Sequence, residues 1–163
     1  MKKLIRKLKI IKIDVFVYVM TEYQSFNFSN PEYTIEKTKS KKKWRYAIRD
    51  SDKIIHKSYL FHNVYLLKLL KKNGPVIGDC KTNTAYRGQS IYPFVINSIA
   101  QEIISNERKE VFIIVNQDNL SSIKGIEKAG FSKYASIKAK RWVWFYLKKQ
   151  ITYLQETNYK NKK

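Results

Sequence analysis

The sequence predicts a single α/β (α+β) domain in which helices cover the faces of a mixed sheet. Three observations lead to this prediction. Apolar residues alternate over 11–19, they recur with helical spacing over 91–105, and a continuous apolar run follows at 111–115. The predicted order begins with several strands, continues with a strand, a helix, a strand and a helix, and ends with two more strands. This order is typical of a sheet packed against helices.

The first predicted strand and the segment after it differ in pattern. The strand over 11–19 has one apolar face, formed by Ile11, Ile13, Val15, Val17 and Val19. Alternation of this kind indicates a strand with at least one buried face. Residues 21–43, in contrast, are polar, so we expect a loop there, with or without one short helix, and a turn at Asn30-Pro31.

A hairpin is predicted next, with strands over 44–49 and 53–61 joined by the turn Asp50-Ser51-Asp52. Residues 62–73 give no clear pattern. Asn73-Gly74-Pro75 then interrupts the chain, and residues 76–82 read as a further strand.

The second half of the chain begins with an amphipathic helix over 91–105. The strand at 110–116 contains the continuous apolar run 111–115, which is typical of a strand covered on both faces. A short helix follows over 121–129, with Gly130 in the position of a C-terminal capping glycine. Aromatic strands at about 131–138 and 141–148 close the fold. The domain therefore spans 1–149, and residues 150–163 form a polar tail expected to fray.

The composition is that of one globular protein domain. The chain has 163 residues, of which 44% are hydrophobic and 14% aromatic, and these fractions exclude a disordered chain. The single cysteine, Cys80, excludes a disulfide framework and a cysteine-rich zinc site. Only two histidines accompany it, so no metal cofactor is expected.

The net charge of +20 favours anionic partners such as nucleic acid, anionic lipid or a phosphate-bearing ligand. The basic residues are spread along the chain, so we interpret most of them as solvated surface around one anion site. The basic N-terminus lacks the uninterrupted apolar run of a signal peptide, and no stretch is long enough to span a membrane. We expect a cytoplasmic protein. Contact of residues 1–12 with a membrane surface remains open.

The most informative segment for function runs from Tyr86 to Tyr92 and joins a predicted strand directly to a predicted helix. The first amides of a helix have no internal acceptor and lie at its positive dipole end, so they bind phosphate groups. Gly88 lets a ligand approach the backbone, and Ser90 can cap the helix. The alternative interpretation is an ordinary strand–helix turn with a serine cap.

This segment resembles the pyrophosphate loop of the GNAT superfamily of acyl-CoA N-acyltransferases. The family pattern is Arg or Gln, two residues, Gly, one residue, then Gly or Ala. Arg87 matches the first position, while Ser90 and Tyr92 replace the two small residues. We expect Tyr92, at the start of the helix, to lean away from the ligand.

A second block is also similar to this family, and the resemblance covers residues 75–148. It includes Asn116, Asp118, Asn119, Ser121, Ser122 and the run Glu127-Lys128-Ala129-Gly130-Phe131. The resemblance implies a three-layer fold with a mostly antiparallel sheet and a shortened N-terminal helical region. It also implies acetyl-CoA as acyl donor, with the thioester in a gap between two diverging parallel strands. The implied cofactor-binding residues are Cys80, Lys81, Thr82, Arg87, Gly88, Gln89, Ser90, Ile91, Tyr92 and Asn119.

The catalytic acid of many family members is a tyrosine at the position occupied here by Ile126. For the base, Asp79 and His56 are the candidates. Asp79 lies in the predicted central strand, where burial would raise its pKa, and His56 has a suitable intrinsic pKa. Both also have a purely structural interpretation. Cys80 as a nucleophile lacks an identifiable base.

The resemblance implies acetyl transfer to an amine, and the run Gly-Asp-Cys-x-Thr-Asn is similar to small members encoded with surface-polysaccharide genes. That likeness points to an amino sugar acceptor, for example a nucleotide-linked one. The alternative is a degenerate fold that binds CoA or nucleic acid without turnover. Nucleic-acid binding would use Trp142, Trp144, Phe145 and Tyr146, although at strand spacing these are more typical of a core. A homodimer remains open.

Overall fold

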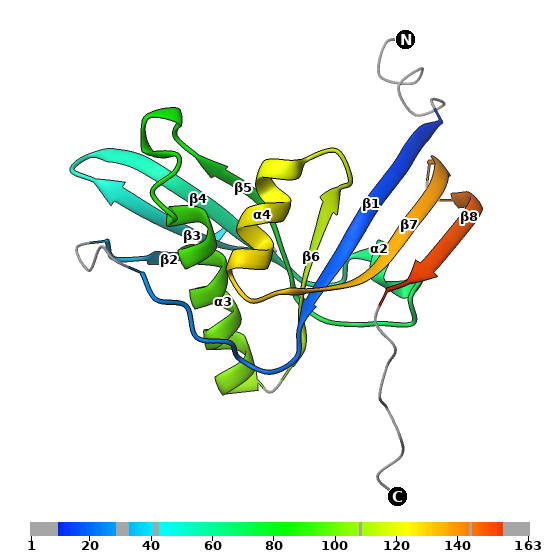
Figure 1. The fold of residues 1–163 in the computed structure, drawn as a ribbon, viewed down its shortest axis with the longest axis horizontal. Helices are drawn as coiled ribbons and strands as arrows, with labels where there is room; N and C mark the ends of the chain where they lie inside the picture. The colour runs from blue at the N-terminus through cyan, green and yellow to red at the C-terminus, as the bar shows by residue number, and fades with distance from the viewer. Residues whose placement is uncertain (1–9, 29–32, 41–42, 108, 144, 155–163) are drawn as a thin grey trace, which may run out of the picture.

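The computed structural model describes residues 10–28, 33–40, 43–107, 109–143 and 145–154. They form one eight-stranded sheet and three helices, an α+β fold (Figure 1). The strands are β1 (Ile11–Met20), β2 (Glu36–Ser40), β3 (Lys43–Asp50), β4 (Lys53–Phe61), β5 (Val76–Thr82), β6 (Val111–Asn116), β7 (Ser132–Trp142) and β8 (Phe145–Tyr153). Their order is β2-β3-β4-β5-β6-β1-β7-β8.

Helices cover both faces of the sheet, as the sequence predicts. The helices α3 (Ile91–Glu107) and α4 (Leu120–Lys128) pack on one face over a core that includes Ile77 and Ile113. The single turn α2 (Tyr65–Lys68) packs on the other face, where Leu67 joins a smaller core. In the described part of the chain, no helix has the length and apolar character needed to cross a membrane.

The first strand lies in the middle of the sheet, between β6 and β7, and is antiparallel to both. Its predicted apolar face is confirmed in part, since Val15, Val17 and Val19 are buried in the core beneath α2 and Ile13 packs against that core, whereas Ile11 is 44% exposed. Tyr18 and Met20 are buried on the opposite face, against α3 and α4. A strand buried on both faces in this way links the two cores.

The pairing of β5 with β6 is the one parallel contact in the described sheet. It consists of two residue pairs, Val76↔Phe112 and Ile77↔Ile113. Both strands continue beyond these pairs, and Figure 1 shows them diverging. The chain connects them through α3, as a parallel crossover requires.

The predicted elements of the central region are confirmed to within two residues: the hairpin β3–β4, strand β5, helix α3, strand β6 and helix α4. Gly130 has φ +88° and follows Ala129, the C-cap of α4, so its capping role is also confirmed. The turn predicted at Asn30-Pro31 lies outside the described residues.

Two predictions at the ends of the sheet are wrong. Residues 36–40 were expected in a loop, but they form β2, which pairs with β3 along its whole length. The C-terminal hairpin is shifted, because β7 continues to Trp142 and β8 to Tyr153. The residues from Gln150 to Tyr153, expected to fray, pair with β7, and Ile151 packs against the core beneath α2.

A buried amide holds the segment after β1 against the two long helices. Asn97 of α3 is 3% exposed, and its side-chain nitrogen donates to the carbonyls of Gln24 at 2.7 Å and Ala129 at 3.0 Å. Its oxygen accepts from the Tyr23 hydroxyl at 3.2 Å. Because all three bonds converge on one side chain, α3 and the end of α4 are fixed relative to each other.

Candidate functional site

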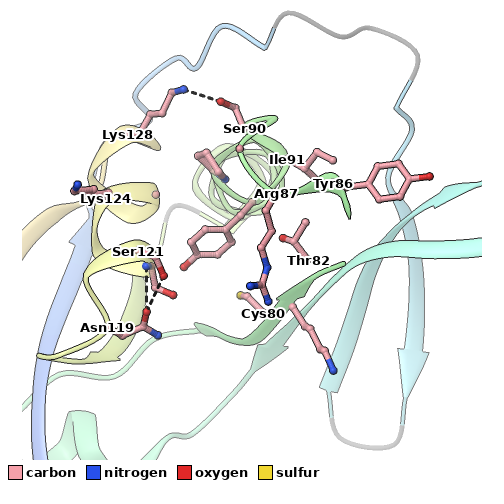
Figure 2. Close-up of a pocket in the computed structure, with 16 residues that line it drawn as sticks. Cys80, Thr82, Tyr86, Arg87, Ser90, Ile91, Asn119, Ser121, Lys124 and Lys128 are labelled. Carbon is pink, nitrogen blue, oxygen red and sulfur yellow. Dashed lines mark hydrogen bonds between the residues drawn. The ribbon is translucent and has the colours of Figure 1, made fainter. Parts of the chain in front are cut away.

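A cavity of about 550 Å³ lies at the end of the sheet where β5 and β6 diverge. Its walls are the end of β5, residues 86–93 and one side of α4 (Figure 2). The predicted cofactor-binding residues that line it are Cys80, Lys81, Thr82, Arg87, Gly88, Ser90, Ile91, Tyr92 and Asn119. Gln89 does not line it, and its side-chain oxygen accepts a 3.5 Å hydrogen bond from Tyr33.

The cavity is strongly positive. Four basic residues line it, and no acidic residue is found among the described residues that do so. These basic residues are Lys81, Arg87, Lys124 and Lys128. Because they lie around a concave surface, their fields add and favour a multiply charged anion.

Sequence reasoning missed the contribution of α4 to this charge. Lys124 and Lys128 are four positions apart and therefore lie on one side of the helix, while Ile123 and Ile126 are buried. Figure 2 shows the two lysines across the pocket from Arg87. The spacing of the lysines was visible in the sequence, but their position opposite the start of α3 is a tertiary feature.

The loop before α3 leaves several amides free to bind an anion. Within the described part of the chain, the amides of Ser90, Ile91 and Tyr92 find no hydrogen-bond acceptor. Gly88 has φ +82°, a conformation that favours glycine, and a Cβ built there would have no atom within 4 Å. The backbone of Gly88 is therefore open to a ligand in the cavity.

Ser90 stands where the family pattern has glycine, and it adopts φ +60°. This conformation is uncommon for a residue with a side chain. The hydroxyl accepts a 2.6 Å hydrogen bond from Lys128 Nζ, which links the loop to α4. Asn119 acts as the N-cap of α4, since its side chain accepts from the Ser122 amide at 3.2 Å.

Tyr92 lines the cavity, so the expectation that it leans away is wrong. Its ring lies against α4: a Cβ built on Gly125 would be 2.6 Å from Tyr92 Cδ1. Burial, followed by the nearby Cys80 thiol, raises the pKa of the Tyr92 hydroxyl well above its usual value. The phenol therefore stays protonated and can donate a hydrogen bond into the cavity.

His56 lies behind the cavity wall rather than on it. It is 0% exposed, and its two ring nitrogens are 2.8 Å from the hydroxyls of Thr82 and Ser58. Burial lowers the pKa of His56 to about 4. The imidazole is therefore neutral at neutral pH, and its contact with the cavity runs through Thr82.

The cysteine in the cavity wall is a poor candidate for a nucleophile. Burial raises the pKa of Cys80 to about 12, and this outweighs the lowering by a hydrogen bond from Ser58. Since the thiolate is the reactive form, a neutral thiol disfavours a covalent route.

Asp79 is not buried as expected. Its side chain is 65% exposed, and Lys43 Nζ lies 3.7 Å from its carboxylate. The residue has φ +51° and lies where β5 contains one residue more than β4, between the pairs Tyr59↔Gly78 and Lys57↔Lys81. This β-bulge breaks the regular alternation of the strand, and Asp79 does not line the cavity.

Compared with known proteins, the chain matches no protein-family model, and no curated protein matches it significantly.

The neutral His56 predicts a pH-dependent stability. The folded pKa of about 4 lies below the unfolded value near 6.5, so only the unfolded chain takes up this proton as the pH falls between them. The free energy of unfolding should therefore fall by up to roughly 3 kcal/mol from pH 7 to pH 4. Urea titrations at several pH values measure this slope. The exposed His62→Gln variant should keep the slope, and an equal slope in His56→Gln would contradict the assignment.

The contact between Tyr92 and α4 predicts that the effect of Gly125→Ala on the free energy of unfolding changes sign when the Tyr92 ring is removed. Gly125→Ala should destabilise the wild-type chain by about 1–3 kcal/mol, because the new methyl group overlaps the Tyr92 ring. In a Tyr92→Ala background the same change should be neutral or stabilising by up to about 1 kcal/mol, as expected for a helical glycine. Denaturant unfolding measures both effects. Equal destabilisation in both backgrounds would show that the ring can move away.

Proposed function

We propose that this chain transfers an acyl group from an acyl-CoA donor, most simply acetyl-CoA, to an amine. One observation supports the proposal above the others. The end of β5, the loop 87–92 and Asn119 are far apart in the sequence, yet they line one positive cavity where two parallel strands diverge. These are the parts that the GNAT resemblance pairs with pantetheine, pyrophosphate and the second half of the cofactor site.

The cavity suits a pyrophosphate group in charge and geometry. The residues at the start of α3 whose amides have no acceptor line the same cavity as Arg87, Lys124 and Lys128. Arginine and lysine side chains form charge-assisted hydrogen bonds with phosphate oxygens. Gly88 leaves room for the backbone to approach the ligand. Together these groups would hold two linked phosphates.

The pantetheine arm would follow the edge of β5 through Cys80, Lys81 and Thr82. Beyond Ile77 this edge has no pairing with β6, so its backbone groups face the gap between the strands. Acetyl-CoA, when bound, supplies the activated acyl group. The chain's own residues bind and orient it and control protons around it.

Tyr92 is the candidate hydrogen-bond donor to the leaving group. Ile126 is 0% exposed and part of the core, so no phenol stands at the position where many family members have one. Tyr92 lines the cavity, and its hydroxyl stays protonated near Cys80. Because the pKa of this phenol lies well above that of a thiol, it would stabilise a departing thiolate by a hydrogen bond rather than transfer its proton.

The described residues of the cavity provide no strong base. His56 is too weak a base to hold a proton at neutral pH, because its pKa is about 4. Asp79 carries its exposed carboxylate beside Lys43, outside the cavity. The acceptor amine must therefore lose its proton to solvent before it attacks, and an acceptor with a low pKa is favoured. An amino sugar, the acceptor that the family likeness suggests, meets this requirement better than a lysine side chain does.

The second candidate is a binding module without turnover. The absence of a phenol at Ile126, the serine at position 90 with φ +60° and the Tyr92 ring inside the cavity favour it. All three are departures from the family pattern, and Ser90 and Tyr92 line the proposed site. The turnover experiment below separates the two functions.

Binding of CoA tests the cofactor site. Calorimetry should detect CoA binding at least tenfold tighter than binding of pantetheine, which lacks the phosphates. Lys124→Gln should weaken CoA binding by about fivefold to tenfold and leave pantetheine binding unchanged, because a charged hydrogen bond contributes roughly 1.5–3 kcal/mol, less after solvent screening. The control is Lys53→Gln, an exposed lysine at the start of β4. Equal affinity for CoA and pantetheine would exclude the loop as a pyrophosphate site.

Turnover tests the chemistry. Thiol release from acetyl-CoA is measured with a panel of nucleotide-linked amino sugars and simple amines. The pH at which the rate reaches half its plateau should follow the pKa of each acceptor. The variants His56→Gln and Asp79→Asn should leave this half-plateau pH unchanged. Tyr92→Phe should lower kcat by about 10²-fold. A half-plateau pH that stays fixed across acceptors would show that the protein supplies a base. No release with any amine would favour the binding module.

A further inference from the structure

An exposed apolar patch lies at the turn end of the last hairpin. Trp142 is 40% exposed, Phe145 63% and Leu147 47%, and the first two rings stack with centroids 6.4 Å apart. Ile10, 52% exposed, directly precedes the neighbouring β1 and lies on the same face as Lys12, because side chains alternate along the strand. Exposed apolar groups are ordinary when scattered, but a contiguous group marks an interaction surface.

The patch belongs to the face of the sheet opposite α2. The register pairs Trp142 with Phe145 and Lys140 with Leu147, so these four side chains share one face. Ala139 and Tyr146, on the alternate positions, belong to the core beneath α2. The patch is therefore separate from that core.

Basic residues surround the patch. Residues 138–149 contain five Lys or Arg and no Asp or Glu. Lys12 of β1 pairs with Lys140 and extends the positive charge across the hairpin. The one acidic side chain on the adjoining part of β1, Asp14, lies 4.0 Å from Lys138. An apolar centre with a basic border is complementary to an anionic membrane surface.

A lipid surface fits this patch better than nucleic acid does. Nucleic-acid bases stack on flat rings, whereas Leu147 and Ile10 are aliphatic and offer no such platform. Aliphatic and aromatic side chains together, with tryptophan among them, are typical of groups that enter the headgroup region of a bilayer. Figure 1 shows the hairpin turn and the start of β1 at one extremity of the sheet, where a planar surface can reach them.

A second copy of the chain fits less well. In a symmetric dimer the patch would pack on itself and bring Lys12 and Lys140 of each copy close to the same lysines of the other. Like charges opposed across an interface disfavour association. The net charge of +20 adds to this repulsion.

We infer that the hairpin end formed by Trp142, Phe145 and Leu147, with the lysines around it, docks the protein on anionic phospholipid membranes. The apolar side chains enter the headgroup region, and the lysines contact lipid phosphates. The patch and the cavity lie toward the same end of the sheet, since β5 and β6 end there and β1 begins there. Docking therefore keeps the cavity near the membrane surface. This inference is independent of the acyl transfer proposed above.

Vesicle co-sedimentation with the full chain tests the inference. Vesicles of equal parts phosphatidylglycerol and phosphatidylcholine should bind the protein, pure phosphatidylcholine vesicles should bind at least tenfold less, and high salt should weaken the binding. Phe145→Ser together with Leu147→Ser should lower the partition coefficient by about tenfold. Lys140→Gln should lower it by about fivefold.

The chain provides matched controls for both changes. Leu154 is 47% exposed, like Leu147, but lies beyond the other end of β8, so Leu154→Ser should bind vesicles as the wild type does. Lys53→Gln removes a distant charge and should change binding by less than Lys140→Gln does. Thermal unfolding of each variant confirms that it is folded.

Three results would overturn the inference. The first is equal binding to anionic and neutral vesicles, or none to either. The second is unchanged vesicle binding in the folded Phe145→Ser, Leu147→Ser variant. The third is that the protein dimerises in solution or binds a single-stranded oligonucleotide, and that this variant abolishes that association but still binds vesicles.

Discussion

The parallel pairing of β5 with β6 ends after two residue pairs, and the candidate site depends on this limit. Ile77 and Ile113 hold the strands together because both are buried beneath α3 and α4. Beyond them the strands diverge, and the start of α3 and one side of α4 face the gap. Backbone groups at the edge of β5 are thus left for a ligand, and a longer parallel ladder would have closed the cavity.

The second constraint is the charge gathered around that cavity. Lys81, Arg87, Lys124 and Lys128 lie together without an acidic residue among the described lining, beside amides that have no acceptor. In the absence of an anion these positive groups repel one another. A polyanionic ligand relieves the repulsion and supplies acceptors for the amides, so its binding stabilises the folded chain. The hydrogen bond from Lys128 to Ser90 brings the two sides of the site together.

Buried polar groups fix the elements around the site. His56, Ser58 and Asn97 are the buried polar residues of the described chain, and no buried side-chain nitrogen or oxygen there lacks a partner. His56 connects β4 with β5 through Thr82, and Asn97 connects α3 with the end of α4. Since an unpaired polar group would be costly in the core, these bonds favour one arrangement of the cavity walls.

The local sequence was sufficient for the elements around the site and for its loop. Periodicity located the alternating strand at 11–19, the hairpin and the helix at 91–105, and the strand–Arg-Gly–helix run identified the candidate anion site. Periodicity reports which face of an element is apolar, but it does not report which neighbour covers that face. The place of β1 between β6 and β7 therefore could not be read from the sequence.

The tertiary structure decided the features that depend on distant partners. The polar strand β2 exists because it pairs with β3, and the residues after Gln150 are ordered because they pair with β7. A bulge in β5 leaves Asp79 exposed, the position of α4 brings two lysines to the cavity, and contact with Gly125 keeps Tyr92 inside it. Each feature comes from contacts between residues far apart in the chain, which a pattern of neighbouring residues does not contain. The sequence by itself thus determined the elements around the site and the chemistry of the loop, and packing decided the strands at the sheet ends and which other side chains share the cavity.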